Sequence, residues 1–169
     1  MATRRPAPPP RAAKPPAAVP GRSAEVNRYL AAYIMGVANR LAVGASAHYR
    51  RHHNLGMSEW RTIMAIGPST HRIVREVAEM ADLDVALVSK SLKLLVQRGL
   101  VAMQATQTRG RAAIVSLTPE GLALHRQLRA SALRRHRRLL SAFTADEVRL
   151  LWSLLERVEA AVPRMNAEP

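Results

Sequence analysis

The stretch that most constrains the fold runs from residue 82 to residue 121. Apolar residues recur in its first part at steps of three and four, as along one buried face of a helix: Val85, Val88, Leu92, Leu95 and Val96. Asp84 stands before them as a helix N-cap, and Gly99 follows where a helix end favours a left-handed residue. The pattern predicts a short helix whose other face is polar.

Two alternating segments follow this helix. Residues 100–105 and Ala113–Leu117 alternate as strands do, and residues 107–111 (QTRGR) indicate the turn of a β-hairpin between them. Thr118 and Pro119 have the residue types that cap and begin a further helix. A helix followed by a hairpin with an arginine-rich tip is the outline of a winged helix-turn-helix, in a fold that is mainly α with a small β-hairpin wing.

Several motifs, in order and at their spacing, resemble the MarR family of transcriptional regulators over residues 26–163. The matching segments are SEWR at 58–61, VAE at 77–79, VSK at 88–90, RGLV at 98–101 and VSLTPEG at 115–121. The resemblance implies a winged helix-turn-helix over about residues 55–118. It also implies dimerisation helices over about residues 25–53 and 119–163.

Two positions depart from the family pattern. Arg109 stands where the family often has an aspartate that orients the wing arginine, here Arg111. Leu87 stands where a small hydroxyl residue is common, and it is open to either of two roles, contact with thymine methyl groups or packing.

The predicted DNA contacts lie on the helix and on the hairpin tip. Polar side chains can reach base edges or phosphates from a helix in the major groove, and arginines from the wing can enter a narrow minor groove. The predicted DNA contacts are Ala86, Leu87, Ser89, Lys90, Lys93, Arg109 and Arg111. The alternative is an ordinary amphipathic helix with solvated lysines.

The formal net charge of +14 favours a polyanionic partner, nucleic acid before membrane. Charge alone fits equally a non-specific architectural DNA-binding protein. The chain has no cysteine, which excludes disulfides and thiolate chemistry, and it carries no catalytic motif. We therefore predict double-stranded DNA as a partner, no cofactor, no metal and no enzymatic activity.

Long apolar helices outside the winged part predict a homodimer. Residues 25–53, 119–143 and 145–163 carry more apolar surface than one small domain can cover, and a two-fold dimer would bury it. Such symmetry predicts a pseudo-palindromic operator. Within these helices, Thr144 and Glu147 have the spacing of a capping box, and RRHRR at 134–138 indicates either a solvated face or a phosphate contact.

The family resemblance implies a small aromatic or amphipathic effector. Its predicted contacts are Tyr49, Arg51, His52, Trp60 and Arg61, with a cation for a carboxylate and a ring to pack on. Trp60 has the alternative of a core position. His48 and His52, one helical turn apart, have the alternatives of a metal pair, a surface or dimer-interface role, or a place in the effector pocket. A ligand-binding protein that has lost DNA reading is a further alternative.

Residues 1–24 are rich in proline and alanine and basic, so we expect a disordered tail, either solvated or reaching DNA. We see no unbroken apolar run of about 18 residues and no signal-peptide pattern. The sequence therefore predicts a cytoplasmic, dimeric, sequence-specific transcriptional repressor released by a ligand.

Overall fold

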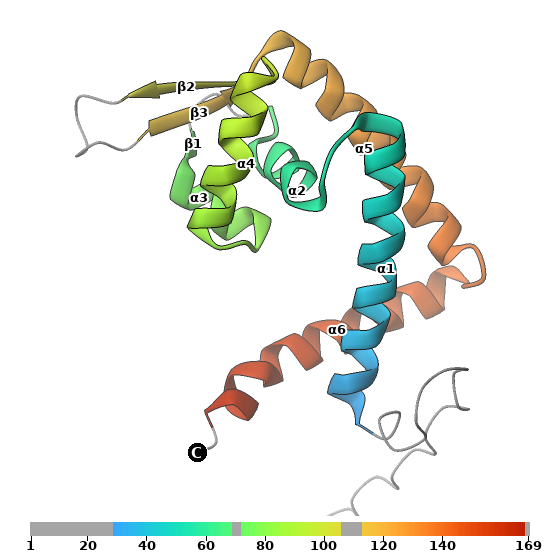
Figure 1. Ribbon diagram of the computed structural model, residues 1–169. Helices are drawn as coiled ribbons and strands as arrows, with labels where there is room; N and C mark the ends of the chain where they lie inside the picture. The colour runs from blue at the N-terminus through green and yellow to red at the C-terminus, as the bar shows by residue number, and fades with distance from the viewer. Residues whose placement is uncertain (1–28, 69–71, 106–112, 168–169) are drawn as a thin grey trace, which may run out of the picture. The chain divides into compact units, whose positions relative to one another are not determined.

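The computed structural model describes residues 29–68, 72–105 and 113–167 and is mainly helical with a small sheet (Figure 1). Two compact units make up the chain, one ending at Met57 and the other beginning at Ser58. The elements in chain order are α1 (Leu30–His53), α2 (Met57–Ile66), β1 (Arg72–Ile73), α3 (Val74–Ala81), α4 (Val85–Gln97), β2 (Val101–Ala105), β3 (Ala113–Leu117), α5 (Pro119–Leu140) and α6 (Ala145–Asn166). The predicted fold class is confirmed. The predicted tail, residues 1–24, lies outside the described residues.

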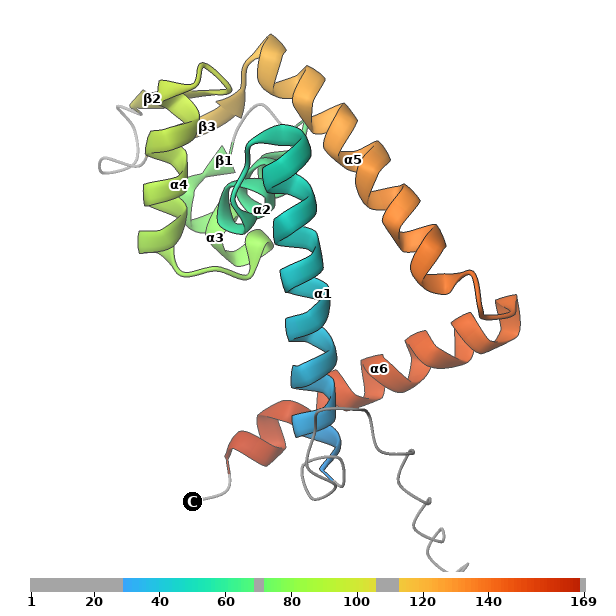
Figure 2. The same cartoon turned by 45° about the vertical axis from the view of Figure 1, so that its right-hand side comes forward.

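The hairpin has the predicted strands. β2 and β3 pair antiparallel with Val101 opposite Leu117 and Ala105 opposite Ala113, and the predicted turn lies outside the described residues. The short strand β1 adds to the other edge of β3, so the sheet order is β1-β3-β2 (Figure 2). Two residues are too few to give an alternating pattern, so β1 was not predicted from the sequence.

The core of the second unit forms where α3 and α4 pack together and against the sheet. The fully or nearly fully buried apolar residues there are Val77, Ala78, Ala81, Val88, Leu92, Leu95, Val101 and Val115. Three predicted core residues of this region are instead exposed: Val85 by 50%, Val96 by 41% and Met80 by 54%. They lie at the margins of narrow apolar stripes, and an apolar residue at such a margin can remain in contact with water.

Hydrogen bonds of Thr118 connect the C-terminal end of α4 to the N-terminal end of α5 at the base of the hairpin. α4 ends in a left-handed Gly99 with φ +68°, and the Leu100 amide donates to the Leu95 carbonyl at 2.9 Å. The Thr118 hydroxyl donates to the Gly99 carbonyl at 2.7 Å and accepts from the Gly121 amide at 3.0 Å. One side chain therefore caps α5 and binds it to the end of α4.

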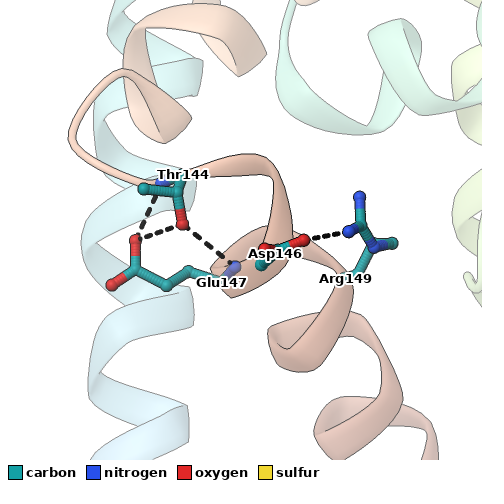
Figure 3. Close-up of polar contacts among 4 residues, drawn as sticks. All are labelled: Thr144, Asp146, Glu147 and Arg149. Atoms are coloured by element: carbon teal, nitrogen blue, oxygen red, sulfur yellow. Dashed lines mark hydrogen bonds and ion pairs between the residues drawn. The ribbon is translucent and has the colours of Figure 1, made fainter.

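The helix α6 begins with the predicted capping box. The Thr144 amide donates to the Glu147 carboxylate at 2.8 Å, and the Glu147 amide donates to the Thr144 hydroxyl at 3.3 Å (Figure 3). Asp146 and Arg149 form an ion pair in the same turn. The predicted end at Pro163 was wrong, because the helix continues to Asn166 with the proline inside its last turns.

In the first unit, α1 ends at Asn54, a left-handed residue with φ 50°. Of the predicted apolar stripe of α1, Tyr49 is buried, whereas Leu30 and Leu41 are exposed. No membrane-length apolar run was expected, yet α1 reaches the length and mean hydropathy, 1.2, of a membrane-spanning helix. A helix from the interior of a soluble assembly passes the same test, so length and composition alone assign no membrane.

Candidate nucleic-acid interface

The turn between α3 and α4 sets where α4 begins. Asp82 ends α3 with a left-handed φ of 50°, and the Leu83 amide donates to the Ala78 carbonyl at 3.0 Å. Asp84 then caps α4, its carboxylate accepting from the Leu87 amide at 2.7 Å. This reversal within a few residues packs α3 against α4 and leaves the N-terminal end of α4 at the surface (Figures 1 and 2).

An ion pair connects this turn to the helix α2. The Arg61 guanidinium, on α2, lies 3.1 Å from the Asp82 carboxylate, with the two side chains 34% and 96% exposed. Exposed pairs contribute little to stability, about 0–1 kcal/mol. Their geometric effect is to connect α2 with the residue that reverses the chain before α4.

The polar face of α4 carries the predicted helix contacts. Ala86, Lys90 and Lys93 follow one another at steps of four and three, so they share one side of the helix, and all three are exposed. Val88, Ser91, Leu92 and Leu95 are buried on the other side. Leu87 is 36% exposed, and the Ser89 hydroxyl is engaged with the Val85 carbonyl at 2.8 Å.

The structure thus places five of the seven predicted DNA-contacting residues on α4, where Ser89 is half-buried and the other four are exposed. Arg109 and Arg111 lie outside the described residues. Within the helix, Val85–Gln97 contains two lysines and no acid, so this face attracts phosphate. A shallow hollow of about 400 Å³ beside the turn carries Glu79, Asp82 and Asp84 together with Arg75, and is less favourable for phosphate. DNA contact by the individual residues stays a prediction.

The five predicted effector contacts belong to both units. In the first unit Tyr49 is buried, with its ring centroid 5.2 Å from that of His48, whereas Arg51 and His52 are exposed. In the second unit Trp60 is half-buried, and Arg61 binds Asp82. The Arg61–Asp82 pair was not foreseen, because the two residues are 21 positions apart in the sequence and give no local signal. The effector site as a whole stays a prediction.

The histidine pair on α1 is close but does not complete a metal site. The ring centroids of His48 and His52 are 4.6 Å apart. In the part of the chain that the structure describes, no group of three His, Asp or Glu side chains has the arrangement to hold a metal ion. A structural zinc site takes four ligands, and a catalytic one takes three, so two histidines are not enough.

Comparison with known proteins agrees with this geometry. A MarR family model matches residues 53–112, which include α2, α3, α4 and β2. A MarR/EmrR family transcriptional regulator from Acinetobacter sp. ADP1 is 27% identical, with a TM-score of 0.74 over 82% of this chain and 98% of the other. No curated protein matches the chain by sequence.

Two further structures were solved with bound partners. The PcaV regulator of Streptomyces coelicolor, in complex with its natural ligand, is 25% identical, with a TM-score of 0.66 over 79% of this chain and 96% of the other. The S. aureus MepR–DNA complex is 13% identical and shares the fold, with a TM-score of 0.71 over 79% of this chain and 99% of the other. The family is one of transcriptional regulators and not of enzymes, as predicted. The family model matches residues 53–112, and the MarR/EmrR regulator shares the fold over 82% of this chain. These similarities identify a MarR-type winged helix-turn-helix, DNA-binding transcriptional regulator.

Proposed function

We propose that the protein is a cytoplasmic, dimeric repressor that recognises a pseudo-palindromic operator and leaves it when a small ligand binds. The observation that carries the DNA-reading part is the α4 surface, where Lys90 and Lys93 are exposed opposite a fully buried side. A helix of this kind fits the major groove, and lysine can donate to the O6 and N7 atoms of guanine. Arg109 and Arg111 would reach the flanking minor groove.

The dimer is supported by apolar surface that the chain leaves exposed. α6 has no buried residue among those described, and it carries Leu150, Leu151, Trp152, Leu154 and Leu155 with 37–59% of each exposed. Patches of this kind mark association surfaces. A two-fold dimer would place two α4 helices about 34–36 Å apart, one turn of DNA.

Sedimentation of the full chain tests the dimer. We expect a mass twice that of the chain, falling toward the monomer in Trp152→Glu, because a buried charge opposes association. Arg164→Ala, an exposed change on the same helix, is the control and should leave the mass unchanged. A wild-type monomer at micromolar concentration would contradict the proposal.

Release by a ligand is supported by the PcaV structure with its natural ligand and by the cations of α1, Arg51 and His52, which can bind a carboxylate. A ligand lowers DNA affinity only if it prefers the conformation that DNA does not. Calorimetry with aromatic carboxylic acids and amphiphiles should give heat and weaken DNA binding, and Arg51→Ala should reduce both. No heat and no change in DNA affinity would contradict this part.

Specific DNA reading is tested with the DNA upstream of the gene and a shuffled duplex of the same length, both titrated from low to physiological salt. We expect the affinities to differ by about a thousandfold at physiological salt. Lys90→Ala should reduce that difference, whereas Arg164→Ala should not.

The other readings predict different results. An architectural protein would bind both duplexes equally, with affinities that fall together as salt rises, and would show no discrete sites in a genome-wide pull-down. A ligand-binding protein that has lost DNA reading would bind neither duplex at physiological salt, and Lys90→Ala would have no effect.

A further inference from the structure

The exposed side chains of the first turn of α4 are apolar. Val85 is 50% exposed, Ala86 is exposed, and Leu87 is 36% exposed. These residues follow the N-cap directly, at the end of the helix that a helix-turn-helix protein brings to the base edges. An apolar surface at this position restricts which bases can lie against it.

The polar groups near this turn are engaged within the helix itself. The Asp84 carboxylate accepts from the Leu87 amide at 2.7 Å. The Ser89 hydroxyl donates to the Val85 carbonyl at 2.8 Å, and the buried Ser91 hydroxyl donates to the Leu87 carbonyl at 3.0 Å. Along the exposed face, the first charged donor is therefore Lys90, one turn into the helix.

The major groove offers one apolar group among the four ordinary bases, the C5 methyl of thymine. A hydrogen-bonding base edge placed against Ala86 and Leu87 would lose water without gaining a partner, and such burial is unfavourable. A thymine methyl in the same place removes apolar surface from water on both sides. The first turn of α4 therefore favours thymine over cytosine.

We propose that each operator half-site carries thymine opposite Ala86 and Leu87 and that Leu87 recognises it through the C5 methyl. Lys90, one turn further on, then meets the neighbouring base pair. The inference rests on the proposed function, because it specifies which chemical feature of the operator α4 reads.

The experiment begins with selection of binding sites by the full-length protein from a pool of random duplexes. In the selected operator, each thymine of the half-sites is replaced in turn by deoxyuridine, which differs only in lacking the methyl. Replacement at the predicted position should weaken binding about fourfold in one half-site and about fifteenfold in both, the effect of losing one buried methyl per half-site. The other thymines should have little effect.

Two variants assign the effect to a side chain. Leu87→Ala should bind the thymine operator more weakly and should be nearly indifferent to deoxyuridine at that position. Leu94→Ala, on the same side of α4 but two turns further from the N-cap and 41% exposed, should keep the wild-type sensitivity. Both positions are exposed, so circular dichroism should show the wild-type fold for each.

Three results would overturn the proposal, and they are distinguishable. Selection that enriches no sequence overturns it together with the proposed specific reading of DNA. An enriched operator whose affinity is unchanged at every deoxyuridine position overturns the methyl recognition alone. A sensitivity to deoxyuridine that persists in Leu87→Ala overturns the assignment to Leu87, whatever the result for Leu94→Ala.

Discussion

The carbonyl of Leu100 occupies the space in which a side chain at residue 121 would begin, so only glycine fits there. A Cβ built on Gly121 would overlap the Leu100 carbonyl oxygen and would stand 3.3 Å from the Cβ of Leu117. The obstruction is backbone, which cannot swing aside as the end of a flexible side chain can. Gly121 therefore allows α5 to begin directly against the base of the wing.

Gly121→Ala should destabilise the fold by about 1–3 kcal/mol, because the added methyl forces α5 away from the hairpin. Gln127→Ala, an exposed change on the same helix, is the control and should alter the stability by less than about 0.5 kcal/mol. Urea unfolding followed by circular dichroism measures both. A Gly121→Ala variant as stable as the wild type would show that the approach of Leu100 to α5 is not this close.

Substitutions of Asp82 should separate the effect of its left-handed backbone on stability from the effect of its charge. Its left-handed φ of 50° favours glycine and tolerates asparagine, whereas alanine there costs about 1–2 kcal/mol. The pair with Arg61 is exposed and contributes about 0–1 kcal/mol. We expect Asp82→Gly and Asp82→Asn to lie within about 1 kcal/mol of the wild type and Asp82→Ala to be the least stable in thermal unfolding. Equal stability of Asp82→Ala and Asp82→Gly would contradict the left-handed backbone.

Glu147 should titrate below its ordinary pKa of 4.5. The Thr144 backbone amide lowers the pKa of this carboxyl most, and the Thr144 hydroxyl lowers it further, because both donate to the charged form (Figure 3). Its contribution to stability is then present above pH 4.5 and is lost as the pH falls through the lowered value. A carboxyl-detected NMR titration checks this.

In Thr144→Ala the pKa of Glu147 should rise toward 4.5 without reaching it, since the backbone amide remains. Glu147→Gln supplies the stability control: its melting temperature should differ from that of the wild type at pH 7 and approach it as the pH falls through the lowered pKa. A pKa of Glu147 at or above 4.5 in the wild type would be inconsistent with the capping box.

His125 on α5 should titrate below 6.5. Burial lowers the pKa of this imidazole most, and the neighbouring Arg129 and Arg126 lower it further by charge repulsion. Protonation then favours the unfolded chain, so this histidine leaves stability intact above pH 6.5 and reduces it as the pH falls below that value. NMR titration of the ring protons should give a higher pKa in Arg129→Gln and no change in Arg138→Gln. A pKa of His125 that is unchanged in Arg129→Gln would contradict the proximity of the two side chains.

Local patterns in the sequence were sufficient where neighbouring residues decide the structure. Asp84, Thr118 and Thr144 each accept a hydrogen bond from a backbone amide within three residues, and all three caps were predicted from residue type and spacing. Gly99 likewise takes the left-handed conformation expected at a helix end. The buried stripe of α4 and the strands of the hairpin followed from periodicity, since one face of each packs on the core.

The predictions that were wrong concern positions where residues distant in the sequence, or the margin of a buried face, decide the structure. Val85 and Met80 are apolar and lie beside buried neighbours, yet each is about half exposed in the described chain. Strand β1 exists because β3 offers an unpaired edge, a property that its own two residues do not carry. Pro163 was predicted to end α6, but the helix continues to Asn166. Proline lacks one backbone N–H, yet the Pro163 carbonyl still accepts from the Ala167 amide at 3.1 Å.

In the candidate site, too, some features followed from the sequence and others depended on the tertiary structure. The sequence alone determined which residues α4 presents, because a helix of known phase and a known buried side leaves Ala86, Lys90 and Lys93 on the other. Only the tertiary structure decided that Arg61 binds Asp82 and that the Leu100 carbonyl excludes a side chain at Gly121. Helical phase is a property of neighbouring residues and can be read along the chain. Long-range pairing and close backbone contacts depend on how separate elements pack, and that is settled only when the whole fold forms.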